Sequence, residues 1–203
     1  MTIALVLLGL SHYPDAMGFF SRLLGRPSSS APRIVAHEAF DGAIRVIETP
    51  TSPGWQFSED HRQGDGFIVM VLKYIFPMSP VPLALLAKIY AVDDGRQKPQ
   101  DPRQTDWREV FQPLFSSFTA VQTHPAQQLT MKSSLEAMEA VIDGVGAEPA
   151  VSLRVRERRA VAGQEQFIVT AMGTPGAFEE HASEIESWFS TSAFVPIGDS
   201  AEK

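Results

Sequence analysis

The chain of 203 residues contains neither cysteine nor asparagine. Without cysteine, the protein cannot form a disulfide, a thiolate metal site or a thiol nucleophile, and it has no cysteine that could carry a lipid. Without asparagine, it offers no acceptor for N-linked glycosylation. Lysine is also scarce beside arginine, and these biases together are typical of a GC-rich bacterial genome.

The charge balance and the hydrophobic runs exclude further classes of protein. The formal net charge of −7 argues against general nucleic-acid binding, because phosphate backbones attract basic surfaces. The apolar segment at residues 2–10 is far shorter than the roughly 18–20 residues that span a bilayer. We therefore expect a protein with no transmembrane span and no nucleic-acid partner.

Residues 1–32 are predicted to be an extension and a linker ahead of the folded domain. Residues 2–10 have the apolarity of a signal-peptide core, but no basic residue precedes them and no small-x-small cleavage pattern follows. Alternatively, the natural start is Met17, because the next apolar residues have helical spacing; they are Phe19, Phe20, Leu23 and Leu24. That helix would either bind an interface or fold back on its own domain.

The folded domain is predicted to begin at Arg33 with a pair of strands. Ile34–Phe40 and Ala43–Glu48 are apolar segments around Asp41-Gly42, a dipeptide typical of tight hairpins. Glu59–Gly66 is polar throughout and is predicted to be a loop.

Two buried strands are predicted next. Phe67–Ile75 is almost continuously apolar, as expected of a strand covered on both faces. Leu83–Val92 is predicted to be a strand that ends at an Asp-Asp-Gly turn. The segment Phe76–Leu86 forms either a groove wall for an apolar peptide or a part of the core buried under a helix.

Helix signals follow in the middle of the chain. Asp106 and Glu109 have the spacing of a helix start, and Pro113 should kink this helix or shift its start. Its apolar face comprises Trp107, Val110, Phe111, Leu114, Phe115 and Phe118. Ser134–Ile142 is a second, weaker helical candidate, and residues 143–146 are predicted to be a turn.

The last third of the chain predicts a hairpin and a helix. Ser152–Val161 alternates between apolar and charged side chains, a turn at Ala162-Gly163 follows, and Phe167–Ala171 returns as a second strand. The helix after residue 176 directs apolar side chains inward and glutamates outward. The inward set is Phe178, Ala182, Ile185, Trp188 and Phe189, and the outward set is Glu179, Glu180, Glu184 and Glu186. The pattern thus predicts a strand, a tight turn, a second strand and an amphipathic helix in this order.

Three short motifs follow one another in a characteristic order. They are the turn Pro53-Gly54-Trp55 after the early strand pair, the hairpin at Val161–Gly163, and a terminal helix that runs from Thr174-Pro175 to Ser192–Phe194. In this order, over roughly residues 33–195, the chain resembles the Mog1/PsbP/DcrB-like family. The resemblance implies an α+β fold with a central antiparallel sheet flanked by helices, a Mog1/PsbP-like α/β/α sandwich. It also implies a single domain, residues 33–197, followed by a tail, residues 198–203.

The resemblance also implies a partner-binding protein instead of an enzyme. The family comprises a nuclear-transport cofactor, photosystem accessory proteins and secretion-associated bacterial proteins, which share no catalytic motif. Bacterial DcrB-type members are usually lipoproteins, and this chain has no cysteine to carry the lipid. The resemblance therefore points to cytoplasmic relatives, such as chaperones that accompany secreted effectors.

Motifs for catalysis, cofactors and metals are not found in the sequence. The five histidines lack the spacing of metal ligands, and Gly144-Val-Gly146 lacks the third glycine of a dinucleotide loop. His61 lies in the densest polar cluster, which is predicted to be a solvated loop, and Asp93-Asp94 is predicted to be a hairpin turn and not a cation site. We expect no catalytic residue, no cofactor and no metal.

Three arginines on one strand face give the sharpest surface hypothesis. Arg154, Arg156 and Arg158 repel one another unless anionic groups lie opposite. An acidic segment of a protein partner or an anionic ligand would supply such groups, so these arginines are the predicted partner-binding residues. Alternatively, glutamates of the terminal helix or of a neighbouring strand neutralise them.

Three functions remain open. The first is a non-enzymatic, secretion-associated adaptor or chaperone that binds a protein partner. The second is a small-molecule binder or hydrolase with a pocket between sheet and helices, near His61, Asp93 or His181. The third is self-association through exposed sheet edges or faces, as a homodimer. A deep polar pocket would favour the second function, and a shallow apolar surface would favour the first.

Overall fold

The computed structural model describes residues 33–36, 40, 42–46, 49–50, 52–64, 67–77, 81–91, 100–116, 118–146 and 152–196. The predicted extension at residues 1–32, the start at Met17, the tail at residues 198–203 and the turn at Asp93-Asp94 lie outside these residues. The domain boundaries therefore stay predictions.

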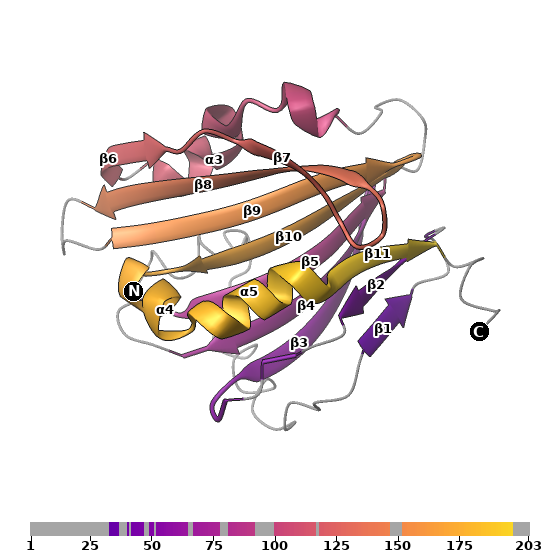
Figure 1. Ribbon diagram of the computed structural model, residues 1–203, viewed down its shortest axis with the longest axis horizontal. Coiled ribbons are helices and arrows are strands. Elements are labelled where there is room, and N and C mark those ends of the chain that lie inside the picture. Colours follow the sequence, from indigo (N-terminus) through magenta and orange to yellow (C-terminus); the bar gives the residue numbers. More distant parts are fainter. Residues whose placement is uncertain are drawn as a thin grey trace.

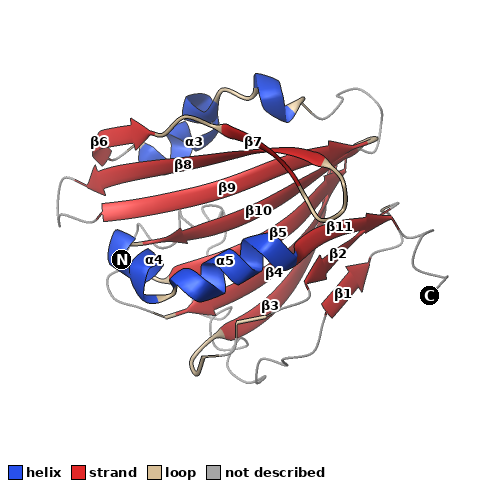
Figure 2. Cartoon of the chain, viewed as in Figure 1, coloured by secondary structure: helices blue, strands red, loops and turns tan. Residues whose placement is uncertain are grey.

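Strands dominate the described part of the chain (Figure 1 and Figure 2). Eight of them form one large sheet, in which every pairing is antiparallel. The order across the sheet is β3 (Gln56–Gly64), β4 (Phe67–Phe76), β5 (Leu83–Ala91), β10 (Glu165–Gly173), β9 (Ser152–Ala162), β8 (Glu136–Gly146) and β6 (Phe118–Thr123), with β7 (Gln127–Thr130) beside β6 along β8. The predicted antiparallel sheet is confirmed.

A smaller sheet joins segments from both ends of the domain. Its order is β1 (Arg33–Ala36), β2 (Gly42–Val46) and β11 (Ser192–Pro196). β1 and β2 pair with Ala36 opposite Ala43, so the predicted strand pair is confirmed, but Gly42 lies within β2 and not in a two-residue turn. Figure 1 shows β11 continuing directly from the end of α5 (Ala182–Thr191), so that the small sheet and the helix lie over the same face of the large sheet.

The two faces of the large sheet carry separate apolar cores. On the α5 face, α5 packs against the sheet and Trp188 is fully buried. On the opposite face, the α3 face, α3 (Trp107–Phe115) packs through its aromatic side chains. Leu85 and Leu86 are neighbours on β5, yet the first belongs to the α5 core and the second to the α3 core, because successive strand residues point to opposite faces.

The layers are less regular than the predicted α/β/α sandwich. The α5 face is covered by α5, by α4 (Pro175–Glu180) and by the small sheet, whereas α3 lies at the β6 end of the other face (Figure 1). The fold is α+β and sheet-dominated with few helices, and its layers do not clearly form a sandwich. None of the helices in the described part is long and apolar enough to cross a membrane.

Two stretches that were predicted to be a loop and a helix are strands. Most of Glu59–Gly66 belongs to β3, which lies at the edge of the sheet, where polar side chains remain hydrated. Ser134–Ile142 and the predicted turn at residues 143–146 belong largely to β8. β8 pairs with β9 on one side and with β6 and β7 on the other, and this pairing overrides the helix propensity of its Glu, Ala and Met residues.

The predicted terminal helix is two helices that meet at His181. Thr174 caps α4 by accepting a hydrogen bond from the backbone N–H of Ala177 at 3.2 Å. Because His181 interrupts the helix, two predicted orientations are wrong: Ala182 is exposed, and Glu184 is partly buried.

The other main elements are confirmed. β4 and β5 lie where the apolar runs predicted them, and α3 begins after Asp106, which accepts hydrogen bonds from the backbone N–H groups of Arg108 and Glu109. The β9–β10 hairpin turns at Gly163, whose φ of 61° favours glycine. Residues 83–86 are buried within β5, so this part of the predicted groove wall belongs to the core, whereas Pro77 is exposed.

Candidate functional site

Three arginines on β9 point toward the α5 face, as the alternation in the sequence predicted. We call Arg154, Arg156 and Arg158 the arginine strip. The register places Arg158 opposite Glu139 and Arg154 opposite Asp143 on β8. Opposite charges across a strand pair attract, so β8 itself supplies counter-charges to the arginine strip.

Glu139 links the two most buried arginines. One of its carboxylate oxygens accepts from Arg156 Nε at 2.9 Å, and the other accepts from Arg158 Nε and Nη2 at 3.0 and 2.7 Å. The side chains of Glu139 and Arg158 are only 12% and 11% exposed. Charge-assisted hydrogen bonds of this kind are short and strong, so Glu139 is the central anion of the arginine strip.

Helix α5 closes over the arginine strip. Arg158 Nη1 donates to the backbone carbonyl of Phe189 at 2.7 Å, in the C-terminal part of α5, where the helix dipole favours a cation. Arg156 forms an ion pair with Glu186, and its guanidinium lies 4.3 Å from the centre of the Phe189 ring. These contacts fasten α5 to the sheet.

Asp143 holds the far end of the arginine strip. Its Oδ1 accepts from Arg154 Nε at 2.7 Å. Its Oδ2 accepts from Arg154 Nη2 at 3.0 Å and lies 2.9 Å from His124 Nε2. Burial alone would raise the pKa of Asp143, but the hydrogen bonds from Arg154 and His124 outweigh burial and lower it. The hydrogen bond to Asp143 in turn raises the pKa of Arg154, so both groups stay charged.

All three arginines therefore have carboxylates of β8 or α5 beside them, which is the alternative that the sequence left open. A role of Arg154, Arg156 and Arg158 in binding a partner stays a prediction. A partner carboxylate that reached Arg156 would have to replace Glu186, whose side chain is 67% exposed.

Glu184 is a second acceptor of several hydrogen bonds, and the sequence analysis missed it. It accepts from the backbone N–H and Oγ of Ser52 and from Trp55 Nε1, and His181 Nδ1 lies 2.8 Å from its Oε2. Burial alone would raise the pKa of Glu184, but these hydrogen bonds outweigh burial and lower it. The Pro-Gly-Trp turn is thereby tied to the start of α5. No local spacing reveals this link, because Ser52 and Glu184 are 132 positions apart.

The histidines of the pocket hypothesis are not brought together. His181 packs against the rings of Trp55 and Phe76, at centroid distances of 5.7 and 4.7 Å, where β3 begins and β4 ends. His61 lies further along β3, opposite Met70, with its Nε2 2.6 Å from Glu59 Oε1. Over the described ranges, no group of three His, Asp or Glu side chains is arranged to hold a metal ion.

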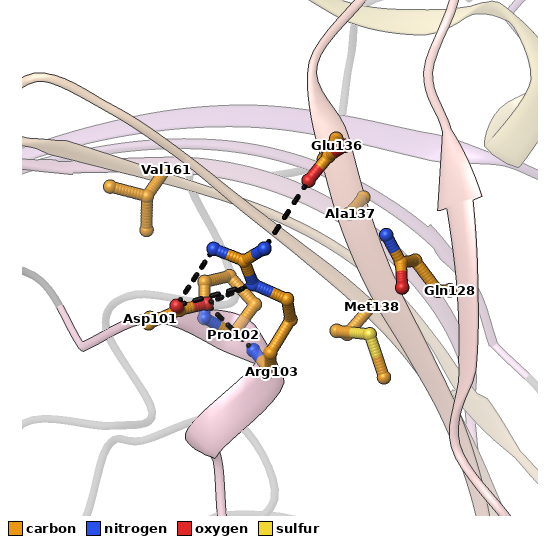
Figure 3. Close-up of a pocket in the computed structure, with 8 residues that line it drawn as sticks. All are labelled: Asp101, Pro102, Arg103, Gln128, Glu136, Ala137, Met138 and Val161. Atoms are coloured by element: carbon orange, nitrogen blue, oxygen red, sulfur yellow. Dashed lines mark hydrogen bonds and ion pairs between the residues drawn. The ribbon is translucent and has the colours of Figure 1, made fainter.

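A half-open hollow of about 330 Å³ lies on the α3 face, between η1 (Pro102–Gln104) and the strands β7, β8 and β9 (Figure 3). Arg103 lies between two carboxylates there, with Nη2 3.0 Å from Asp101 Oδ2 and Nη1 3.6 Å from Glu136 Oε2. The lining consists of Asp101, Pro102, Arg103, Gln128, Glu136, Ala137, Met138 and Val161. These side chains offer charge and apolar surface, and they suit binding better than nucleophilic chemistry.

The large sheet ends at β6 and β7, which we call the outer edge. Both strands pair with β8 on one side, and no strand of the described part pairs with their other side. Residues 119–122 are all exposed, and Val121 is 50% exposed. The outer edge therefore presents a strand backbone that the described strands leave unpaired, with uncharged side chains.

The outer edge also lacks formal charge. No Asp, Glu, Lys or Arg occurs between Glu109 and Lys132, a signal that was visible in the sequence and was missed. Natural sheets usually protect open edges from pairing with another chain by means of charged side chains, prolines or bulges. At the outer edge, the features of this kind are Pro125, between the two strands, and an irregular register near Phe118.

Buried charges on the α3 face were also missed. Lys73 is only 5% exposed, and burial lowers the pKa of both Lys73 and Lys88. Glu157, also 5% exposed, accepts from Arg159 Nε at 2.6 Å and from Thr170 Oγ1 at 3.1 Å. Strand alternation places these residues on one face of the sheet, but no short motif marks them.

No protein-family model matches the sequence, and no curated protein matches it. The fold, in contrast, is similar to solved structures. LpqN of Mycobacterium tuberculosis, described as involved in cell envelope biogenesis, has a TM-score of 0.50 at 12% sequence identity, covering 81% of this chain and 91% of LpqN. The cyanobacterial PsbP (CyanoP) of Synechocystis has a TM-score of 0.53 at 6% identity, covering 83% of this chain and 95% of CyanoP.

Both structures have folds of the Mog1/PsbP/DcrB type, so the resemblance predicted from the sequence is confirmed at the level of the fold. At these identities the likeness concerns the fold alone, because one fold hosts many functions.

Proposed function

We propose that the protein is a non-enzymatic, cytoplasmic adaptor or chaperone that binds an extended segment of a protein partner along the outer edge. In strand addition, hydrogen bonds between main chains supply the affinity, and neighbouring pockets supply the specificity. The observation that carries the proposal is the open, uncharged outer edge, which the described strands leave unpaired.

Small side chains support this choice of surface. Thr119 and Ala120 are exposed and short, so they leave the backbone of β6 accessible to an incoming strand. A bacterial, non-enzymatic role is also consistent with the two similar folds, one of which is described as taking part in cell envelope biogenesis.

The test is affinity capture from native cells with two matched lysine variants. Val121→Lys places a charge on the outer edge, where lysine opposes strand addition. Val145→Lys is the control, because Val145 is 44% exposed and lies on β8, one strand further in. We expect the wild type and the control to capture one stoichiometric partner and Val121→Lys to lose it, as identified by mass spectrometry.

Two results would contradict the proposal. Equal capture by both variants would place the partner elsewhere, and capture of no partner by any form would remove the adaptor function. A purified wild type that dimerises, and that Val121→Lys renders monomeric, would instead identify a second copy of the chain as the occupant.

The arginine strip is a second proposed docking surface. Reversing all three charges would unfold the protein, because each arginine bonds a carboxylate of the fold. Arg154→Gln is the better probe, since Arg154 is the most exposed of the three at 33%. Unchanged partner capture by a folded Arg154→Gln variant would argue against this surface.

A further inference from the structure

We propose that the partner segment carries a lysine or arginine whose side chain enters the hollow beside Gln128. This inference rests on the proposed function, because it assumes that a segment of a partner lies along the outer edge. It adds the chemistry of that segment: extended, mostly uncharged, with one basic side chain opposite β7.

The register brings the outer edge to the hollow. Gln128 of β7 lies opposite Met138 of β8, and both residues line the hollow. Figure 3 shows Gln128 and Met138 on adjacent strands, with Arg103 and Glu136 beside them. An added strand would lie about 4.8 Å beyond β7, and its residue opposite Gln128 would point to the same face of the sheet. That side chain would therefore project toward the hollow.

Charge in the hollow selects a cation. Asp101 and Arg103 neutralise each other, because the guanidinium of Arg103 donates to both carboxylate oxygens of Asp101 at 3.0–3.2 Å. Glu136 is left with one long contact, 3.6 Å from Arg103 Nη1, and its side chain is 65% exposed. The lining therefore carries one surplus negative charge at an accessible carboxylate.

The floor of the hollow suits a long aliphatic stem. Pro102 is buried, and Met138 and Val161 are partly buried beside it. Lysine and arginine lay their methylene chains on such surfaces while the charged end stays hydrated. The volume of the hollow, about 330 Å³, lies at the small end of the range for ligand sites, roughly 300–1,000 Å³. A site of this size suits a single side chain.

The carboxylate of Glu136 would repel an acidic side chain, and an uncharged side chain would form no ion pair with it. The expected preference is modest, because an ion pair at an exposed carboxylate contributes about 0.2–1 kcal/mol, up to about fivefold in affinity. Lysine should therefore be favoured over methionine by about threefold, and over glutamate by more.

The test uses three fluorescently labelled nine-residue peptides that alternate threonine and valine and differ only in a central lysine, methionine or glutamate. Fluorescence anisotropy with the full chain measures their dissociation constants. We expect the order lysine, methionine, glutamate from tightest to weakest. Glu136→Gln should abolish the lysine preference and leave the methionine peptide unchanged, whereas Glu180→Gln, an exposed glutamate on α4, should leave the order intact.

Equal affinities for the three peptides, a preference for methionine or glutamate, or no binding of any peptide would overturn this inference. The proposed function is judged separately, by partner capture with Val121→Lys and Val145→Lys. If the partner is lost only with Val121→Lys and the peptides show no preference for lysine, the proposed function stands. The inference that the partner segment carries a basic side chain is then wrong.

Discussion

Glu139 and Glu184 each gather several donors from distant parts of the chain, and both are mostly shielded from water. Glu139 joins two arginines of β9, and Glu184 joins a turn near residue 52 to the start of α5. An isolated surface ion pair contributes little to stability, but a buried cation that loses its only counter-ion is strongly destabilising. These two residues should therefore dominate the electrostatic part of the stability.

Replacing Glu139 tests the arginine strip. Glu139→Gln keeps the shape of the side chain but leaves Arg158, which is 11% exposed, without a carboxylate neighbour among the described residues. We expect the free energy of unfolding, measured by urea denaturation, to fall by about 3 kcal/mol. Glu180→Gln is the matched control on an exposed site and should change stability by less than about 0.5 kcal/mol. Equal effects of the two substitutions would contradict the central role of Glu139.

Glu184 should make part of the stability depend on acid. Its pKa is lowered by folding, so the unfolded chain binds the proton more readily. The stabilisation is complete above the ordinary glutamate pKa of 4.5 and is lost as the pH falls through the lower pKa of the folded state.

The comparison of the wild type with Glu184→Gln isolates this contribution. At pH 7 the variant should be less stable by about 2 kcal/mol, because hydrogen bonds to a charged acceptor are lost. Urea denaturation at a series of pH values from 5 to 2.5 should show the gap closing. A gap that stays constant over this range would mean that the charge of Glu184 contributes nothing.

At the scale of elements, local sequence patterns correctly predicted the helices and strands whose conformation is not changed by pairing with neighbouring strands. The apolar runs of β4 and β5 and the capped start of α3 carry their own signals, and all were predicted. β8 was not, because residues such as Glu136 and Ala137 favour helix and become strand only by pairing on both sides. The carboxylate contacts of Arg156 come from β8 and from α5, so strand alternation predicted which face the arginine strip occupies but left its partners open.

Gly144 shows the same dependence on a neighbouring element. It was predicted to lie in a turn, yet it lies within β8, where an added Cβ would meet ring carbons of Phe115 at 2.5 Å. Because glycine has no side chain, α3 can pack close to the sheet at this position.

Two glycine-to-alanine substitutions should have opposite effects. Gly144→Ala should destabilise the fold by about 2 kcal/mol, since it overpacks the contact with the buried Phe115. Gly176→Ala, in α4, meets no atom within 4 Å and should stabilise by up to about 1 kcal/mol through helix propensity. Thermal unfolding followed by circular dichroism gives both signs. Two changes of the same sign would contradict the packing of α3 on β8.

At the scale of the molecule, one large sheet is shared by two cores. Trp55 and Trp188 lie in the core on the α5 face, and Trp107 lies in the core on the α3 face. The central strands β4, β5, β10 and β9 contribute side chains to both cores, so damage to one core should weaken the other.

The tryptophans allow this coupling to be measured. In Trp107→Phe, fluorescence reports only the α5 core, while far-ultraviolet circular dichroism reports the whole sheet. Their urea midpoints should coincide, and adding Gly144→Ala on the opposite face should lower both by the same amount. Two separated transitions would show that the cores unfold independently.

The pairing of β5 with β10 has a consequence for synthesis. Leu86 lies opposite Thr170, 84 positions later, and the two strands are neighbours in the middle of the large sheet. At a translation rate of roughly 5–20 residues per second, the ribosome needs about 4–17 s to make the intervening chain. During that interval the nascent β3–β4–β5 segment has an apolar strand, β5, whose partner β10 has not yet been made, so this strand edge stays open to non-native pairing until the last third of the chain emerges.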